Sequence, residues 1–358
     1  MKLTGKIPAW TIVFPVIAWL VFIAGHYILW PLFMVISAIS LIAAVLSAVH
    51  HAETIAHGVG EPFGTLVLAL AVTLIEVSLI VSLMFAGGKE SSVLARDTVF
   101  AAVMIILNGM VGLSLFAGGL RFKEQNFTLQ GISAALTILV TISVVTLILP
   151  NFTTSAPGPF YNKQQLLFVA IITLILYGVF LLVQNVRHRD HFLTADDVEE
   201  EISEKPTGTV ARLSVLMLIV CLVAVVLLAK SLAPGLESWV MSIGAPISLV
   251  GVIIAAVVLL PEGLSAFHAA RKNQLQKSLN LSLGSALASI GLTIPAVSMV
   301  SLYTGLPLSL GISSGSTVLF LTSLFVIILS LSTGKTTILQ GAVLLIIFAI
   351  YIFSIIFP

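Results

Sequence analysis

The chain has 358 residues, of which 59% are hydrophobic and 9% charged, with a formal net charge of +1 and a mean hydropathy of +1.17. Soluble domains carry about 25% charged residues, so this composition excludes a soluble domain and indicates an integral membrane protein. Apolar runs near 20 residues without strand-period alternation exclude an outer-membrane barrel. We find no basic stripe for nucleic acid, and the single cysteine, Cys221, excludes an intramolecular disulfide.

Apolar runs bounded by glycine, proline and charges predict an all-α, polytopic membrane protein of about eleven transmembrane helices. The first run follows Lys2 and Lys6 but is longer than a signal-peptide core of about 7–15 residues, so we interpret it as a membrane span. The expected ranges are 8–29, 31–50, 63–86, 98–118, 131–149, 165–184, 211–230, 245–267, 278–302, 308–330 and 338–357.

Lysine and arginine are distributed unevenly between the two sides that these spans define. Four lie opposite the N-terminus, namely Lys89, Arg96, Lys163 and Lys230. Twelve lie on the N-terminal side, namely Lys2, Lys6, Arg121, Lys123, Arg187, Arg189, Lys205, Arg212, Arg271, Lys272, Lys277 and Lys335. Because cytoplasmic loops carry the excess of basic residues, the N-terminus is predicted to be cytoplasmic and the C-terminus external.

Two polar segments separate these spans. The stretch from His50 to Pro62 is predicted to be a cytoplasmic loop; its His50, His51 and His57 with Glu53 lack the spacing of a tetrahedral metal site, so a metal cluster is the less favoured interpretation. The second segment, 185–210, is predicted to be an acidic cytoplasmic linker, and a solvated linker is favoured over a cation-attracting or regulatory segment. Its acidic residues are Asp190, Asp196, Asp197, Glu199, Glu200, Glu201 and Glu204.

The acidic linker divides the chain into two similar halves. Placing Glu76 on Glu262, an offset of 186 residues (262 − 76), also brings Gly58 onto Gly244. We therefore expect an extra N-terminal helix in 1–30, a first repeat in 31–184 and a second repeat in 211–358. Five helices per half is an odd number, so the repeats are predicted to be inverted, an architecture typical of secondary transporters with a site between the halves.

Two glutamates lie deep in predicted spans. Of the 15 acidic residues, only Glu76, in FGTLVLALAVTLIEVSLIVSLMFA, and Glu262, in GAPISLVGVIIAAVVLLPEGLSAFHAA, are expected well inside the membrane. Such a charge costs about 2.5–3.5 kcal/mol on insertion scales, so the sequence carries it for a function or in a paired or neutral form. Matching places in two inverted halves favour a functional role over a structural hydrogen bond.

Oxygen-bearing side chains accompany the glutamate of the first half. Thr73 lies three residues before Glu76, so both are expected on one helix face. Asn108 lies in the middle of the next predicted span. Each of these polar residues could alternatively bind neighbouring helices together.

The second half offers a similar set. Ser285 and Ser289 are four residues apart and share a helix face. Pro261 lacks an N–H and is expected to break the helix and free a carbonyl one turn before Glu262. Such an all-oxygen set suits hard cations such as Ca²⁺, with both glutamates as metal ligands. Burial favours the protonated carboxylate and a cation the ionised one, so protons and cations would compete for the site.

Two motifs raise the alternative of a membrane enzyme. Gly311 to Gly315 matches the G-x-S-x-G pattern around Ser313, but no histidine follows His268 to serve as its base. The segment is more simply the small-residue start of the tenth helix. The GKT of 334–336 lacks the earlier glycine of a phosphate-binding loop. A passive channel is a third alternative.

Longer stretches around both glutamates resemble a known family. Residues 52–65 (AETIAHGVGEPFGT) and 73–76 (TLIE), with 260–262 (LPE), 271–275 (RKNQL) and 278–287 (SLNLSLGSAL), are similar to the two repeats of the CAX-type cation/proton exchangers, in particular the bacterial ChaA-type antiporters of Ca²⁺ or Na⁺. The resemblance covers nearly the whole chain. It implies that Glu76 and Glu262 bind the exchanged cation and protons, and that Thr73, Asn108, Ser285 and Ser289 occupy ligand positions.

The resemblance further implies a multi-pass protein of the bacterial inner membrane without a cofactor. Its partners would be inorganic cations, protons and the lipid bilayer, and a homo-oligomer remains open. Leu259 offers no side-chain oxygen where the first half has Thr73, and Gly263 stands where many relatives have histidine. Fewer oxygen ligands weaken strict Ca²⁺ selectivity, so an antiporter of Na⁺ or K⁺ with protons is the alternative function.

Overall fold

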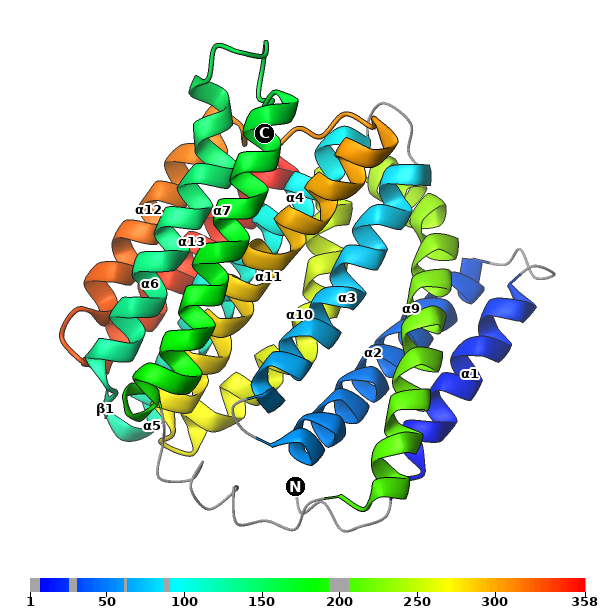
Figure 1. Ribbon diagram of the computed structural model, residues 1–358, viewed down its shortest axis with the longest axis horizontal. Helices are drawn as coiled ribbons and strands as arrows, with labels where there is room; N and C mark the ends of the chain where they lie inside the picture. Colours follow the sequence, from blue (N-terminus) through cyan, green and yellow to red (C-terminus); the bar gives the residue numbers. More distant parts are fainter. Residues whose placement is uncertain (1–6, 26–30, 61–62, 87–90, 193–205, 358) are drawn as a thin grey trace.

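The computed structural model describes residues 7–25, 31–60, 63–86, 91–192 and 206–357. These residues form eleven helical segments and a two-stranded ribbon (Figure 1). The segments are α1 (Trp10–Ala24), α2 (Pro31–Val59), α3 (Phe63–Ala86), α4–η2–α5 (Ser91–Met104, Ile105–Met110, Val111–Phe122), α6–η3–η4 (Leu129–Ser143, Val144–Ile148, Leu149–Phe152), α7–η5 (Lys163–Leu182, Val183–Arg187), α9 (Gly208–Ser242), α10 (Ser248–Arg271), α11 (Leu275–Thr304), α12 (Ser314–Leu331) and α13 (Ile338–Ile356), and the short 3₁₀ turn η6 (Arg189–His191) follows η5.

The predicted polytopic all-α fold is confirmed. Nine helical segments of the described chain are long and apolar enough to cross a membrane, and α1 and the 66–82 part of α3 are shorter apolar helices. Local sequence marks several helix ends. Asn162 and Gln165 form a capping box at the start of α7. Gly305, with φ of 74°, ends α11 in the left-handed conformation that glycine adopts without steric cost.

Four connections between helices meet at one end of the bundle, which we call the ribbon face. Strand β1 (Glu124–Asn126) pairs antiparallel with β2 (Lys335–Thr337) and so joins the α5–α6 and α12–α13 connections. The Gln125 Nε2 donates to the carbonyl of Ala270 over 3.0 Å, which adds the α10–α11 connection. The Asn280 Nδ2 donates to the carbonyl of Phe192 over 2.5 Å, which adds the segment after α7.

Other connections meet at the opposite face. The Ser309 N–H donates to the carbonyl of Ser92 over 3.0 Å, and the Gly311 N–H to that of Pro159 over 3.1 Å. These bonds join the start of α4, the α6–α7 connection and the α11–α12 connection. Consecutive helices joined by these bonds therefore alternate in direction. Because α3 ends at Ala86 and α4 starts soon after at Ser91, α3 runs away from the ribbon face, whereas α10 runs toward it, as inverted repeats require.

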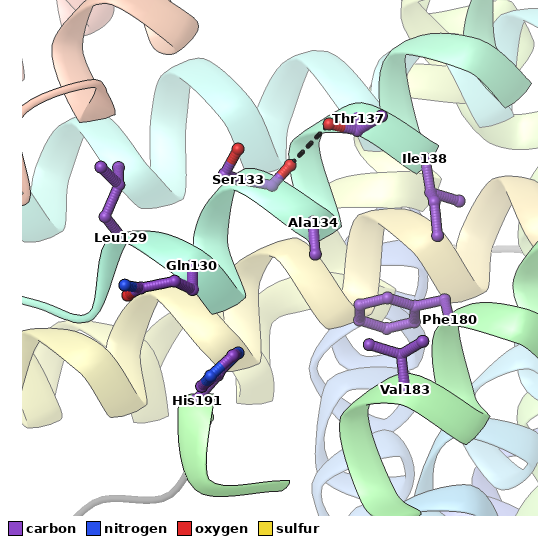
Figure 2. A pocket seen from close by; sticks show the side chains of 9 residues that line it. All are labelled: Leu129, Gln130, Ser133, Ala134, Thr137, Ile138, Phe180, Val183 and His191. Carbon is purple, nitrogen blue, oxygen red and sulfur yellow. Dashed lines mark hydrogen bonds between the residues drawn. The ribbon is translucent and has the colours of Figure 1, made fainter. Parts of the chain in front are cut away.

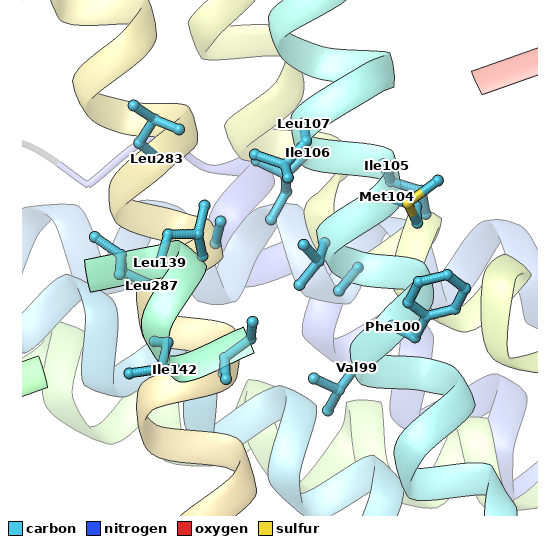
Figure 3. Close-up of a cluster of buried hydrophobic side chains, with 14 of the residues drawn as sticks. Val99, Phe100, Met104, Ile105, Ile106, Leu107, Leu139, Ile142, Leu283 and Leu287 are labelled. Carbon is cyan, nitrogen blue, oxygen red and sulfur yellow. The ribbon is translucent and has the colours of Figure 1, made fainter. Parts of the chain in front are cut away.

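The buried apolar side chains form two main clusters. The larger lies among α4, η2, α6, α7 and α10–α13, and Figure 3 shows part of it around Phe100, Leu139 and Leu287. The smaller joins α1, α2 and α9, which we call the three-helix layer, to one face of α3 and to Val258 of α10. In Figure 1 this layer lies beside α3, away from α6 and α12. The helices with the glutamates thus stand between two packing units.

The predicted loop from His50 to Pro62 is wrong for its first ten residues, because α2 continues through Val59. His51 is buried, with Nδ1 3.3 Å from the hydroxyl oxygen of Ser214 on α9 and Nε2 3.2 Å from the carbonyl oxygen of Thr11 on α1. These partners satisfy both ring nitrogens of the imidazole inside the protein, so the polar segment remains helical. Residues 61–62 lie outside the described part of the chain.

Three other helical segments also differ clearly from their predicted bounds. Helix α4 begins at Ser91 rather than at residue 98, α9 continues past Lys230 to Ser242, and α12 begins at Ser314 rather than at residue 308. The longer α2 and α9 include Glu53 and Glu237, so these helices contain further carboxylates besides the two that were expected. Most of the acidic linker, 193–205, lies outside the described residues.

Candidate cation site

Glu76 lies buried on α3, where it faces α11. Its side chain is 5% exposed. The hydroxyl of Ser289 on α11 donates a hydrogen bond of 2.9 Å to its Oε2. The other oxygen, Oε1, is buried and has no hydrogen-bond partner among the described residues. An unpaired buried carboxylate oxygen is costly unless a cation or a proton occupies it, so Oε1 is a candidate ligand atom.

Glu262 lies buried on α10, and the hydroxyl of Ser285 on α11 donates to its Oε2. Helix α10 runs without interruption through Pro261, which differs from the predicted helix break. Membrane helices tolerate proline where neighbouring helices compensate for the lost hydrogen bond. The effect of Pro261 is thus limited to its missing N–H, which cannot bond the carbonyl of Val257 one turn earlier.

Helix α11 brings the two carboxylates together. Ser285 and Ser289 are one turn apart, with Cβ atoms about 5–6 Å apart at this spacing. They contact glutamates from different halves, Glu262 and Glu76, and the two carboxylates also interact electrostatically with each other. The sequence predicted the shared face of the serines, but it did not predict that Ser289 binds the glutamate of the first half.

The structure does not join Thr73 or Asn108 to the carboxylates by hydrogen bonds. Thr73 is buried one turn before Glu76, and within the described chain its hydroxyl forms no bond to that residue. Asn108 lies in the π-helical turn η2, where its Nδ2 donates to the hydroxyl of Ser323 on α12 over 3.0 Å. Its Oδ1 is buried without a partner in the described residues.

Sequence reasoning missed one further hydroxyl beside the site. Thr293 lies one turn beyond Ser289 on α11 and close enough to Glu76 to interact with its carboxylate. Its hydroxyl is fully buried and unpaired among the described residues. The spacing of four residues from Ser289 is the signal that could have identified it. No comparable spacing in the sequence indicated Ser323, the hydrogen-bond partner of Asn108.

The other candidate motifs have different roles. The Ser313 hydroxyl accepts the N–H of Ser316 over 3.2 Å and caps α12, as expected of a helix start. Within the described residues, no group of three or more histidine, cysteine or acidic side chains could hold a metal ion. A groove of about 630 Å³ along α6 and α7 (Figure 2) has Gln130 and His191 in its lining but no carboxylate, so it is not the cation site.

A family model described as sodium/calcium exchanger protein matches residues 27–186 and 213–357. The chain belongs to this family. Sequence relatives of the exchanger include an ionic transporter of Sinorhizobium fredii, y4hA, 46% identical over 319 residues, or 89% of this chain and 87% of the relative. The sodium-potassium/proton antiporter ChaA of Escherichia coli is 37% identical over 353 residues, or 96% of this chain and 95% of the relative.

Solved structures share the fold of this exchanger. Native YfkE superposes with a TM-score of 0.74 at 18% identity, covering 97% of this chain and all 100% of the other. The H⁺/Ca²⁺ exchanger CAX gives 0.73 at 15% identity, covering 97% and 88%. The family places the exchanger among multi-pass secondary transporters of inorganic cations rather than among enzymes, which confirms the predicted class.

Proposed function

We propose that this exchanger exports Ca²⁺ from the cytoplasm in exchange for protons, with Na⁺ and K⁺ as alternative substrates. The observation that carries the proposal is the attachment of Glu76 and Glu262 to successive turns of α11 in a buried, all-oxygen site. The name of the E. coli relative supports proton-coupled exchange. A Bacillus subtilis relative, 25% identical, is named a Ca²⁺/H⁺ antiporter.

The charge of the site favours a divalent cation. Two ionised carboxylates are balanced by one Ca²⁺ or by two protons, so either occupant leaves the buried site neutral. Neutrality matters because a net charge in a low-dielectric interior is costly. One Na⁺ or K⁺ would require one carboxylate to keep a proton. The same pair could thus exchange one Ca²⁺ for two protons or one monovalent cation for one proton.

Competition between the two occupants gives exchange when access alternates between the membrane faces. The glutamate helices α3 and α10 lie between the three-helix layer and the larger core cluster. We infer that displacement of these two units against each other exposes Glu76 and Glu262 to one face at a time. A cation would leave when protons replace it, and protons would leave when a cation replaces them.

We propose that the protein lies in a bacterial inner membrane with its ribbon face in the cytoplasm. Exposed Arg121, Lys123, Arg271 and Lys272 lie at this face, near the ribbon and the α10–α11 connection. Basic residues gather on the cytoplasmic side of membrane proteins. In this orientation the N-terminus is cytoplasmic and the C-terminus external, and cytoplasmic Ca²⁺ would enter from the ribbon face.

A monovalent-cation/proton antiporter is the second candidate. The name of the 37% identical relative favours it. So does the composition of the site, because Leu259 adds no oxygen at the position that Thr73 has in the first half. Ca²⁺ usually takes six to eight oxygen ligands, whereas the hydrogen-bonded site supplies two carboxylates and two hydroxyls before water is counted.

The test uses purified protein in sealed liposomes that contain a pH-sensitive dye and an imposed proton gradient. Ca²⁺, Na⁺, K⁺ and Mg²⁺ are added separately. Collapse of the gradient by Ca²⁺ at low concentration supports the first candidate, and collapse only by Na⁺ or K⁺ supports the second. No response to any cation from folded protein would overturn both.

A further inference from the structure

Hydroxyl side chains line α11 from the ribbon face to the candidate site and beyond it. They recur every three or four residues, so they fall on one helix face. That face is the one that meets the carboxylates, because two of its members bind Glu262 and Glu76. We call it the hydroxyl stripe, and it consists of Ser278, Ser282, Ser285, Ser289 and Thr293.

The part of the stripe between the ribbon face and Glu262 is buried but not fully paired. Ser278 and Ser282 are both 0% exposed. The Ser278 hydroxyl has no hydrogen-bond partner in the described part of the chain. The Ser282 hydroxyl donates to the carbonyl of Ser278 over 2.9 Å, which leaves its oxygen free to accept. Buried polar groups without a protein partner are the places where proteins hold internal water.

The stripe begins close to solvent. Helix α11 starts at Leu275, shortly after exposed Lys272 and Asn273 and half-buried Gln274. From Ser278 to Ser285 the helix rises about 10 Å, at about 1.5 Å per residue. Ser282 divides this distance into steps of about 5–6 Å, and a single water molecule can bridge each step. The spacing of the two serines therefore allows a path of short, water-bridged steps between the ribbon face and Glu262.

We propose that Ser278 and Ser282 carry protons between the ribbon face and Glu262, and that the stripe continues through Ser285 and Ser289 to Glu76. This inference rests on the proposed cation/proton exchange. In each step a hydroxyl or water oxygen accepts a proton from the side of Glu262 and releases its own proton toward the ribbon face. Glu262 ends ionised, one proton emerges at the face, and every hydroxyl is restored.

The full burial of Ser278 and Ser282 favours the passage of protons over cations along the stripe. A hydrated cation needs space that two fully buried serines do not provide, whereas a proton moves along a chain of hydrogen bonds without displacing an oxygen atom. Glu76 on α3 and Tyr177 on α7 interact electrostatically with Glu262, so proton release there depends on the charge of Glu76. The cation would reach the site when the three-helix layer is displaced, whereas the proton would move along the hydroxyl stripe.

The test compares two rates in proteoliposomes for Ser278→Ala, Ser282→Ala and the double variant. The first is exchange of cation for protons; the second is self-exchange of labelled against unlabelled cation, which needs no proton movement. The cation is whichever of Ca²⁺, Na⁺ or K⁺ the wild type exchanges. The matched control is Ser298→Ala, because Ser298 is also fully buried and unpaired among the described residues but lies on the far side of α11.

We expect the double variant, which removes both hydroxyls between the ribbon face and Glu262, to slow proton-coupled exchange about tenfold, which corresponds to a barrier about 1.4 kcal/mol higher. Self-exchange should stay within about twofold of wild type, and Ser298→Ala should change neither rate. Unchanged proton-coupled exchange in the double variant would overturn the proposal, and so would an equal loss of both rates. Wild-type protein that exchanges no cation would instead overturn the proposed function.

Discussion

The two central helices of the bundle, α11 and α4–η2–α5, occupy corresponding places in the two halves but differ in what they contact. Helix α11 is regular from Leu275 to Thr304 and binds both carboxylates. Its counterpart contains the π-helical turn η2, and the Asn108 in that turn binds Ser323 of α12 instead. A π-turn inserts one extra residue and so rotates the following side chains about the helix axis. The two helices thus occupy similar places, but among the described hydrogen bonds those to both carboxylates come from α11.

The packing of these two helices, by contrast, is similar. Gly291 of α11 lies against Tyr177 of α7, where an added Cβ would come within 2.8 Å of the tyrosine Cβ. Gly112 of α5 lies against Leu344 of α13, where an added Cβ would come within 3.1 Å of the leucine side chain. Each central helix therefore uses glycine to approach the last helix of the opposite half. The two helices therefore differ in the π-turn and in the partners of their polar side chains rather than in this close packing.

The largest expected effect is loss of exchange when either carboxylate is neutralised. Glu76→Gln and Glu262→Gln should both reduce exchange to the background of protein-free liposomes, because each removes a charge that the cation needs. The dye assay measures this, with Glu237→Gln on α9 as the control carboxylate. Substantial exchange by both site variants would show that α11 does not assemble a cation site.

The next largest effect is expected from the two serines of α11 that bind the carboxylates. Hydrogen bonds to charged groups contribute about 1.5–3 kcal/mol, so Ser285→Ala and Ser289→Ala should each weaken apparent cation affinity about tenfold or more. Each loss favours the protonated carboxylate, so the pH of half-maximal exchange should move upward.

Cation titrations of exchange at several pH values measure both effects of the serine substitutions. Ser298→Ala again serves as the control on the same helix. Affinities equal to wild type in both serine variants would contradict the role assigned to α11.

A smaller effect, and of a different kind, is expected for Asn108. Its hydrogen bond to Ser323 joins η2 to α12, and such interhelical bonds in membranes contribute about 0.6 kcal/mol on average. Asn108→Ala should therefore lower the melting temperature while it changes cation affinity less than Ser289→Ala does. Loss of exchange at unchanged melting temperature would instead place Asn108 in the site and make the two central helices equivalent.

The smallest effect is expected for Thr73, which is buried near Glu76, whereas the described hydrogen bond to that carboxylate comes from Ser289. Valine has nearly the same shape, so Thr73→Val should keep cation affinity within about twofold of wild type, or about 0.4 kcal/mol. Cation titrations of exchange, as for the serine variants, measure this affinity. A tenfold loss would show that Thr73 becomes a ligand when the cation binds.

The membrane spans could be predicted because an apolar run of about 20 residues is both the sequence signal and the physical requirement for insertion. The ends of α2 could not be predicted in this way. His50 and His51 look like loop residues, and the contact that keeps His51 inside, to Ser214, spans 163 positions of the sequence. Long-range hydrogen bonds of this kind are not visible in local hydropathy.

The candidate site was likewise predictable where it depends on local sequence and not where it depends on long-range packing. Glu76, Glu262, Ser285 and Ser289 follow from charge within apolar runs and from helical spacing. The pairing of Ser289 with Glu76 depends on how α3 packs against α11, and these two residues are 213 positions apart. The orientation of Asn108 depends on the π-turn, for which local spacing gave no indication.

The ribbon between β1 and β2 sets an order for biogenesis. Residues Glu124–Asn126 leave the ribosome long before Lys335–Thr337, so the edge of β1 stays unpaired while the six helical segments that the structure describes between the two strands, α6 to α12, are inserted. Only when α12 is in place can the antiparallel register of Gln125 with Thr336 form. A nascent chain that stops before β2 keeps exposed donors and acceptors at the ribbon face, a feature by which quality-control proteases could distinguish unfinished from complete transporters.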